Sequence, residues 1–193
     1  MDLTKVLIIG HSIVRRFNQF LNEDDNVRFD SNMGLAATHK VYFKGTCGRK
    51  IDGILREDAH FLRRIKPDHL ILLIGGNDVR PDSSPEELSS KILSLASVLH
   101  QRFFISNIHI CKLLPRFTQK TYYNHIVDKT NMLIKEDIRH LPYASFWEHN
   151  DLFPSPGVKS CSHKFLADGV HLNKQGNVHL YRSLRGLVLS RMR

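Results

Sequence analysis

The sequence predicts a three-layer α/β/α sandwich around a five-stranded parallel sheet of flavodoxin-like topology. Short apolar runs rich in branched residues alternate with longer segments in which apolar residues recur at helical spacing. Right-handed crossovers between parallel strands leave few topologies and favour this strand order. No internal repeat, linker or low-complexity tract interrupts the 193 residues, so a single domain over 1–193 is expected.

The first half of the chain is expected to supply three strands and two helices. Its first apolar run is branched and ends at Gly10, and helical spacing begins near Ser12. The second run is stopped by Gly45 and Gly48, and the third is the most apolar of the chain. The expected elements are a strand at 6–9, a helix from 12, a strand at 41–43, a helix over 51–65 and a strand at 70–74.

The second half continues the alternation. A helix is expected to start at Ser83 or Ser84, because Pro85 and two glutamates then occupy its first turn. The stretch from 150 to 169 is irregular, and its part from 150 to 167 is expected to border the functional site. The remaining elements are a strand at 104–111, a helix over 122–139, a strand at 143–147 and a last helix through Leu180 and Leu184.

The net charge of +9 is the unusual bulk property. It favours contact with a polyanion such as nucleic acid, although a basic surface also serves solubility. Each candidate phosphate contact is equally interpretable as part of a solvated helix face. These candidates are Arg15, Arg16, Arg49, Lys50, Arg63, Arg64, Lys66, Arg182, Arg185, Arg191 and Arg193.

The absence of other motifs excludes several classes of protein. The three cysteines are widely spaced, and no zinc, phosphate-loop or dinucleotide motif occurs, so no metal or cofactor is expected. No apolar stretch approaches the roughly 18 residues of a membrane span, and no signal-peptide core is present. An intracellular, cytoplasmic location is the expectation, and the sequence does not indicate an oligomeric state.

Three strand ends carry residues suited to chemistry, and ligands bind beyond the carboxyl ends of parallel strands. Ser12 places a hydroxyl at a helix start, where it either caps the helix or acts as a nucleophile. Gly48 either offers an N–H to an oxyanion or forms a tight turn. Asn77 offers a side-chain N–H, although asparagine after two glycines is also good turn chemistry.

A fourth segment, Asp168-Gly169-Val170-His171, precedes the last helix. The three-residue spacing lets the carboxylate of Asp168 reach one ring nitrogen of His171 and leaves the other free to take a proton from serine. The alternative is an ordinary loop in which Asn173 caps the helix.

Taken in order, Gly10-His11-Ser12, Gly48, Gly76-Asn77-Asp78 and Asp168-x-x-His171 resemble the four sequence blocks of the SGNH (GDSL-like) hydrolases across nearly the whole chain. The resemblance implies Ser12 as nucleophile, His171 as base oriented by Asp168, and Gly48 and Asn77 as oxyanion donors. It also implies a metal-independent esterase whose substrate is a small ester, such as an acetylated carbohydrate or lipid.

Finer details resemble SGNH domains carried by animal retroelements, notably Ser12–Arg16, Phe146–His149 and Leu180–Gly186. One residue departs from the family pattern, since His11 stands where Asp is usual. A protonated His11 would either assist the oxyanion or oppose the charging of His171. His11 and Asp78 are therefore the expected modulators of the site.

Two functions follow from these observations. The first is a serine esterase acting on short acyl esters. The second is a weakly active or inactive module that binds nucleic acid or protein, for which the basic surface would be the working part. Binding that weakens steeply with salt would favour the second.

Overall fold

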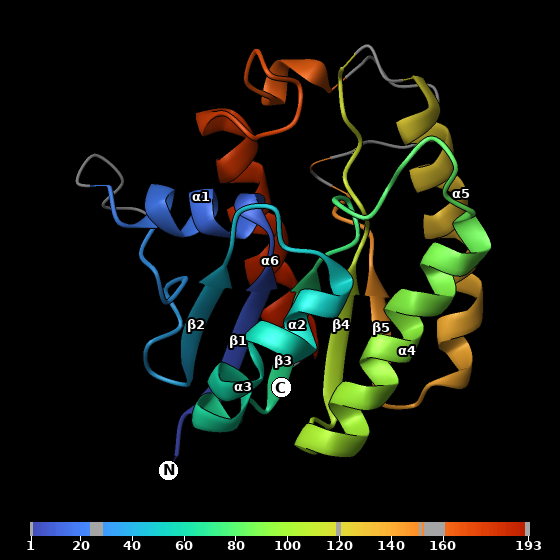
Figure 1. Cartoon of the computed structure of the whole chain (residues 1–193). Helices are drawn as coiled ribbons and strands as arrows, with labels where there is room; N and C mark the ends of the chain where they lie inside the picture. Colours follow the sequence, from blue (N-terminus) through green and yellow to red (C-terminus); the bar gives the residue numbers. More distant parts are fainter. Residues whose placement is uncertain (1, 24–28, 119–120, 151, 153–160, 192–193) are drawn as a thin grey trace.

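The computed structural model describes residues 2–23, 29–118, 121–150, 152 and 161–191 and confirms the predicted fold class. Five parallel strands form one sheet in the order β2-β1-β3-β4-β5 (Figure 1). The strands are β1 (Thr4–Gly10), β2 (His39–Gly45), β3 (His69–Leu73), β4 (Asn107–Cys111) and β5 (Ala144–Trp147). The helices are α1 (Ser12–Leu21), α2 (Ile51–Glu57), α3 (Ala59–Ile65), α4 (Pro85–Phe103), α5 (Thr121–Asp137) and α6 (Lys174–Arg191).

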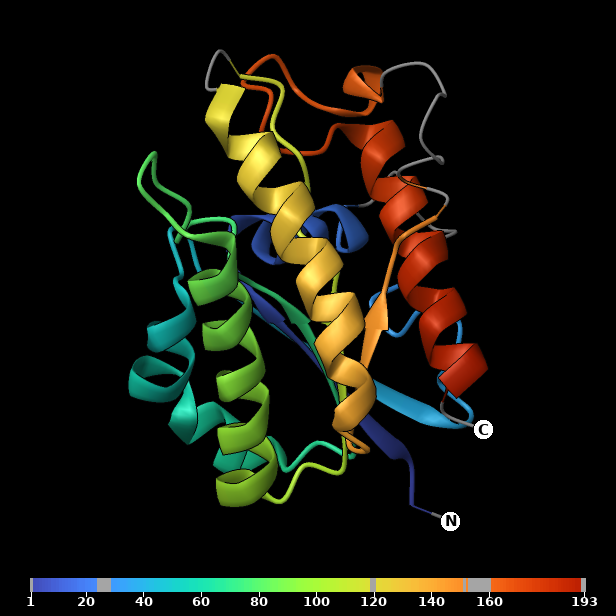
Figure 2. The ribbon, with the colours of Figure 1, turned by 90° about the vertical axis from the view of Figure 1, so that its right-hand side faces the viewer.

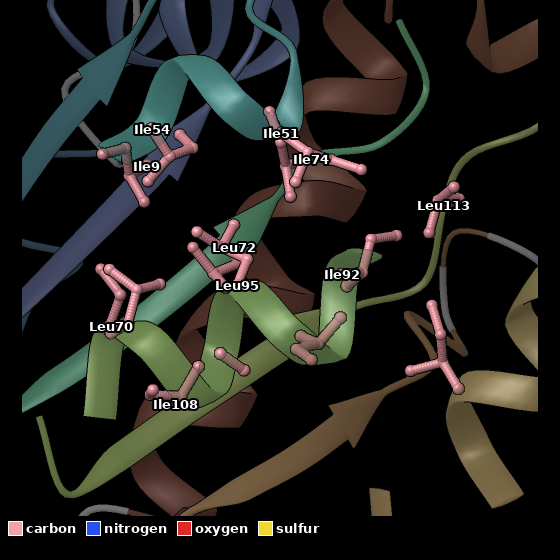
Figure 3. Close-up of a cluster of buried hydrophobic side chains, with 14 of the residues drawn as sticks. Ile9, Ile51, Ile54, Leu70, Leu72, Ile74, Ile92, Leu95, Ile108 and Leu113 are labelled. Atoms are coloured by element: carbon pink, nitrogen blue, oxygen red, sulfur yellow. The ribbon is translucent and has the colours of Figure 1, made fainter. Parts of the chain in front are cut away.

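Helices cover both faces of the sheet, and each face has its own core. Leu7 and Ile9 point to the face packed by α2 to α5, whereas Val6 and Ile8 point to the face packed by α1 and α6. This alternation within one strand follows from the period of two in a β-strand. Figure 3 shows side chains from α2, α4 and the strands meeting in the first core, and Figure 2 shows α6 apart from α4 and α5.

The predicted helix over 51–65 is wrong in one respect, because it consists of two helices that meet at Asp58. The Asp58 side chain is 1% exposed and lies 2.9 Å from Nε of Arg49, which is itself buried. The periodic apolar stripe gave no sign of this break, since the break depends on a charged partner outside the stripe.

The predicted strand start at Phe104 is also wrong. Phe104 ends α4 in the left-handed conformation, with φ of 57°, and β4 begins at Asn107. By contrast, α4 starts as expected, with the Ser84 hydroxyl accepting the N–H of Glu87 and Pro85 in the first turn.

Half of the segment expected to border the site, 150–167, falls outside the described residues. The residues just before it are anchored, since His149 Nδ1 and Trp147 Nε1 lie 2.8 Å and 2.9 Å from the Ser183 hydroxyl of α6. Cys47, Cys111 and Cys161 are free thiols. Within the described ranges, every helix is too short or too polar to cross a bilayer.

Candidate functional site

Ser12 is held at the carboxyl end of the sheet by two close backbone approaches. A Cβ on Gly10 would lie 2.1 Å from the Leu73 carbonyl oxygen, and one on Gly45 would lie 2.1 Å from the Arg15 backbone nitrogen. Only glycine fits such contacts. The Gly10 contact packs the end of β1 against β3, and the Gly45 contact brings α1 directly beyond the end of β2, as Figure 1 shows.

The Ser12 hydroxyl does not cap its helix. His11 is the N-cap, and its Nδ1 accepts the N–H of Ile13 at 3.4 Å. The Ser12 Oγ instead lies 2.8 Å from Nε2 of His171, a residue 159 positions later in the chain. The hydroxyl is therefore available for a bond outside its own helix.

His171 is oriented by the turn that precedes α6. Asp168 Oδ2 lies 2.7 Å from His171 Nδ1, while Asp168 Oδ1 accepts the backbone N–H groups of Val170 and His171 at 2.8 and 2.9 Å. Gly169 has a left-handed conformation, with φ of 65°, which allows this turn. A Cβ at this position would lie 2.4 Å from the Phe117 carbonyl oxygen, so only glycine fits. Asn173 caps α6 through Oδ1, which accepts the Gly176 N–H.

The contacts of Asp168 keep its carboxylate ionised and determine which ring nitrogen of His171 carries a proton. Desolvation raises the pKa of Asp168, but the bonds donated by the His171 backbone and ring and by the Val170 N–H outweigh it and hold the pKa at about 2. The ionised carboxylate accepts an N–H from His171 Nδ1, so Nε2 faces Ser12 as an acceptor. Such a chain can move a proton from the hydroxyl to the imidazole and stabilise the resulting cation.

Asn77 lies beside Ser12, and both line one pocket. Its Nδ2 donates to the Arg49 carbonyl at 3.1 Å, and its Oδ1 accepts from Arg116 Nη2 at 2.9 Å. The same Arg116 nitrogen donates to the Gly76 carbonyl at 2.9 Å. These partners fix which way the amide faces and leave the second Nδ2 hydrogen for a ligand.

Gly48 and Asp78 are placed differently. Gly48, with φ of 68°, lies in the turn after β2 and is not among the residues lining the pocket beside Ser12. Asp78 turns its carboxylate to the N–H of Ile51 at the start of α2, at 3.3 Å from one oxygen. Burial raises the pKa of Asp78 to about 6, although the Ile51 N–H opposes the rise.

His11 is neutral at physiological pH. Desolvation, aided by the nearby charge of Arg116, lowers the pKa of His11 to about 4. Because Nδ1 accepts the Ile13 N–H, the proton of the neutral ring belongs on Nε2, which faces Gly76 and the pocket. His11 therefore adds a neutral donor beside Ser12 and no positive charge.

The pocket beside Ser12 is small, with a volume of about 20 Å³. A single water molecule needs roughly 10–15 Å³ by this measure, so the space accepts a group the size of a methyl. Its walls come from the ends of three strands and from α1 and α5. The apolar side chains among them are Ile13, Leu73, Ile74, Leu113, Leu114, Pro115 and Val170.

Sequence reasoning missed Arg116 and Tyr123, whose ring lies 4.4 Å from the guanidinium of Arg116. Arg116 follows β4, so the fourth strand end was the available signal. Arg49 was wrongly included among surface phosphate contacts. Its side chain is buried against Glu57 and Asp58, and its carbonyl accepts from Asn77. In the described parts of the chain, no cluster of His, Cys, Asp or Glu is arranged to hold a metal ion.

No family model matches the sequence, and the search of curated proteins gives no match. Solved structures do share the fold. A GDSL-like lipase from Bacteroides thetaiotaomicron is 15% identical, with a TM-score of 0.70 over 96% of this chain and 88% of that one. A Bacteroides fragilis protein provisionally described as an acylhydrolase is 12% identical, with a TM-score of 0.73 over 98% and 88%.

An acetylxylan esterase from Geobacillus stearothermophilus, solved as a catalytic mutant with serine replaced by alanine, is 18% identical. Its TM-score is 0.68, and the match covers 95% of this chain and 94% of that one. The chain thus has the fold of the GDSL-like hydrolases.

Proposed function

We propose that the protein is a serine hydrolase that cleaves short acyl esters, acetyl esters above all. The observation that carries the proposal is the hydrogen-bonded chain from Ser12 Oγ through His171 to Asp168, with distances of 2.8 Å and 2.7 Å. The fold shared with lipases and esterases supports it, since one of these neighbours is an acetylxylan esterase with a catalytic serine-to-alanine mutant.

In the proposed mechanism, Ser12 Oγ attacks the ester carbonyl carbon while His171 Nε2 takes the hydroxyl proton. The tetrahedral intermediate collapses as the bond to the alcohol oxygen breaks, and His171 returns its proton to that oxygen. Water then attacks the acyl-serine with His171 again as base, which releases the acid and regenerates Ser12. Asp168 stays ionised and stabilises the imidazolium.

The developing oxyanion would accept the Ser12 N–H, the free Nδ2 hydrogen of Asn77 and the N–H of Gly48. The bonds of Asn77 to Arg49 and Arg116 support its assignment, because they preorganise the amide before substrate binds. Neutral His11 contributes an Nε2–H beside this group in place of the acidic residue usual in SGNH hydrolases. We therefore expect activity to survive that departure.

The pocket of about 20 Å³ supports a short acyl group. A methyl fills it, whereas each further methylene would have to displace wall atoms or remain outside. We expect kcat/KM to fall steeply from acetyl to butyryl to octanoyl esters.

The test is hydrolysis of 4-nitrophenyl acetate by the protein and its Ser12→Ala, His171→Ala and Asp168→Asn variants. We expect Ser12→Ala and His171→Ala to lower kcat by about 10⁴-fold or more, down to the residual rate of binding and oxyanion stabilisation. A fluorophosphonate that modifies Ser12, detected by peptide mass spectrometry, reports nucleophilicity without a chosen substrate. Equal rates in all variants together with an unmodified Ser12 would contradict the proposal.

A second candidate role, nucleic-acid binding, is favoured by a groove at the opposite, amino-terminal end of the sheet. It has a volume of about 690 Å³ and includes Arg63, Lys66, Arg102 and Phe104 in its lining. Phe104 is 85% exposed and left-handed, which costs roughly 1–2 kcal/mol in a residue other than glycine. An exposed ring beside cations is suited to stacking a base and contacting phosphate.

This groove agrees with the net charge of +9 and with the resemblance to retroelement-borne domains. Fluorescence anisotropy with a labelled single-stranded RNA tests it. We expect affinity that falls steeply with salt and weakens in Phe104→Ala and in Arg63→Gln/Arg102→Gln. The exposed Arg182 of α6 lies outside this groove, so Arg182→Gln should leave the affinity unchanged. Affinity indifferent to salt and to Phe104→Ala would remove this role.

A further inference from the structure

A second groove runs along the exposed face of α1, the helix that begins with Ser12. It has a volume of about 390 Å³, far larger than the pocket beside Ser12. One wall is α1, and the other is formed by the residues that follow His171 and by Cys47 of the turn containing Gly48. Its lining residues are Arg15, Arg16, Gln19, Phe20, Glu23, Cys47, Leu166, Leu172, Asn173, Lys174 and Asn177.

Residues that line the groove are neighbours in the sequence of the proposed catalytic residues. Residues 12, 16 and 19 fall on one side of a helix, so Arg16 lies about one turn, roughly 6 Å, beyond Ser12. Leu172 directly follows His171, and Cys47 directly precedes Gly48. Arg15 Nη1 lies 3.1 Å from Cys47 Sγ, which closes the groove against that turn. We therefore expect a substrate whose acyl group occupies the small pocket to extend its alcohol part towards the groove.

The groove has a strong charge preference. Arg15, Arg16 and Lys174 are exposed, and none of them forms an ion pair with any residue that the structure describes. One carboxylate, that of Glu23, lies near the distal end of α1 and leaves a net positive lining. Unpaired cations around a concave surface focus a positive potential and attract anions. Arginine adds planar donors that match the oxygens of phosphate.

We propose that this groove binds an anionic group on the alcohol side of the substrate, so that the protein hydrolyses acetyl esters of alcohols carrying a phosphate or a similar compact anion. Arg16 and Arg15 contact the anion, and Lys174 contributes charge from the start of α6. This inference rests on the proposed esterase function, since it assigns the substrate class of the same site.

The test compares 1-acetylglycerol 3-phosphate with 1-acetylglycerol at constant ionic strength, with acetate release as the readout. We expect the ratio of the two kcat/KM values to favour the phosphorylated ester by about 10-fold or more, because hydrogen bonds to charged groups contribute at least this much. The ratio should fall about 10-fold in Arg16→Gln and approach one in Arg15→Gln/Arg16→Gln/Lys174→Gln. Arg182→Gln, on the same helix as Lys174 but outside the groove, serves as the matched control.

A ratio near one in the unmodified protein overturns the inference while leaving the esterase function intact. Binding of glycerol 3-phosphate to Ser12→Ala, measured by calorimetry, tests the groove without catalysis. Binding lost in the triple variant supports the groove even if no ester is hydrolysed, and absence of binding overturns it. Sedimentation with phosphatidic acid vesicles, compared with the soluble phosphate, shows which source of phosphate the groove accepts.

Discussion

Replacing Arg116 should disable Asn77, the proposed oxyanion donor, without touching the proposed reacting groups. Arg116 Nη2 donates to Asn77 Oδ1 and to the Gly76 carbonyl, each at 2.9 Å, and its guanidinium stacks on Tyr123. Arg116→Gln removes these bonds and lets the Asn77 amide rotate away from the carbonyl of Arg49. In the proposed mechanism, Arg116 is a positioning residue.

The expected magnitude follows from the bonds that are lost. A hydrogen bond from a charged donor contributes about 1.5–3 kcal/mol. If that energy holds the amide in its productive orientation, its loss lowers kcat by about 10- to 100-fold. Asn77→Ala removes the donor itself and should lower kcat by about 10²- to 10³-fold.

A double-mutant cycle separates this role from a structural one. The kcat values of Arg116→Gln, Asn77→Ala and the double variant are measured with 4-nitrophenyl acetate, and circular dichroism checks that each variant is folded. We expect the double variant to be no slower than Asn77→Ala, because Arg116 acts through Asn77. Fully additive losses, or a change in KM alone, would refute the reasoning.

Three further predictions concern stability. Gly45→Ala places a Cβ 2.1 Å from the Arg15 backbone nitrogen, and we expect the free energy of unfolding, measured in urea, to fall by about 3 kcal/mol or more. A near-neutral change would contradict the close approach of α1. Phe104→Gly relieves a left-handed conformation and should stabilise the fold by about 1 kcal/mol, measured as a higher urea midpoint; an unchanged or lower midpoint would argue against strain there. Desolvation lowers the pKa of His11 to about 4 and that of His149 to about 3, so below pH 6.5 the unfolded state binds protons that the native state does not. The free energy of unfolding should therefore fall as the pH drops from about 6.5 towards 4, and less steeply in His149→Gln. A flat profile would exclude this cause.

Much of the fold followed from local pattern. Short branched runs ending in glycine located the strands near Val6–Ile9 and Leu70–Ile74 within a few residues. Parallel strands that are buried on both faces are apolar at nearly every position, which makes them easy to recognise. The helix break at Asp58 did not follow, because the buried pair with Arg49 joins residues whose contact is tertiary. The left-handed Phe104 was missed for a related reason, since a large apolar residue before a strand looks like the strand itself.

For the site, the sequence predicted which residues occupy the strand ends and that Asp168 could reach His171. The contact of His171 with Ser12 was expected from the resemblance and lies in the structure at 2.8 Å, whereas the chemical roles remain proposals. Arg116 and the carbonyl of Arg49 were not predicted. Backbone carbonyls carry no sequence signal, and the orientation of an amide depends on neighbours brought together only by folding.

The 159 positions that separate Ser12 from His171 have a consequence for synthesis of the protein. Because a chain emerges from the ribosome with its N-terminal part first, α1 can pack on β1 long before the turn before α6 exists. Until that turn docks, the Ser12 hydroxyl lacks its contact with His171. In the proposed mechanism, ester cleavage therefore begins only once that turn has docked, and its appearance during translation would time that docking.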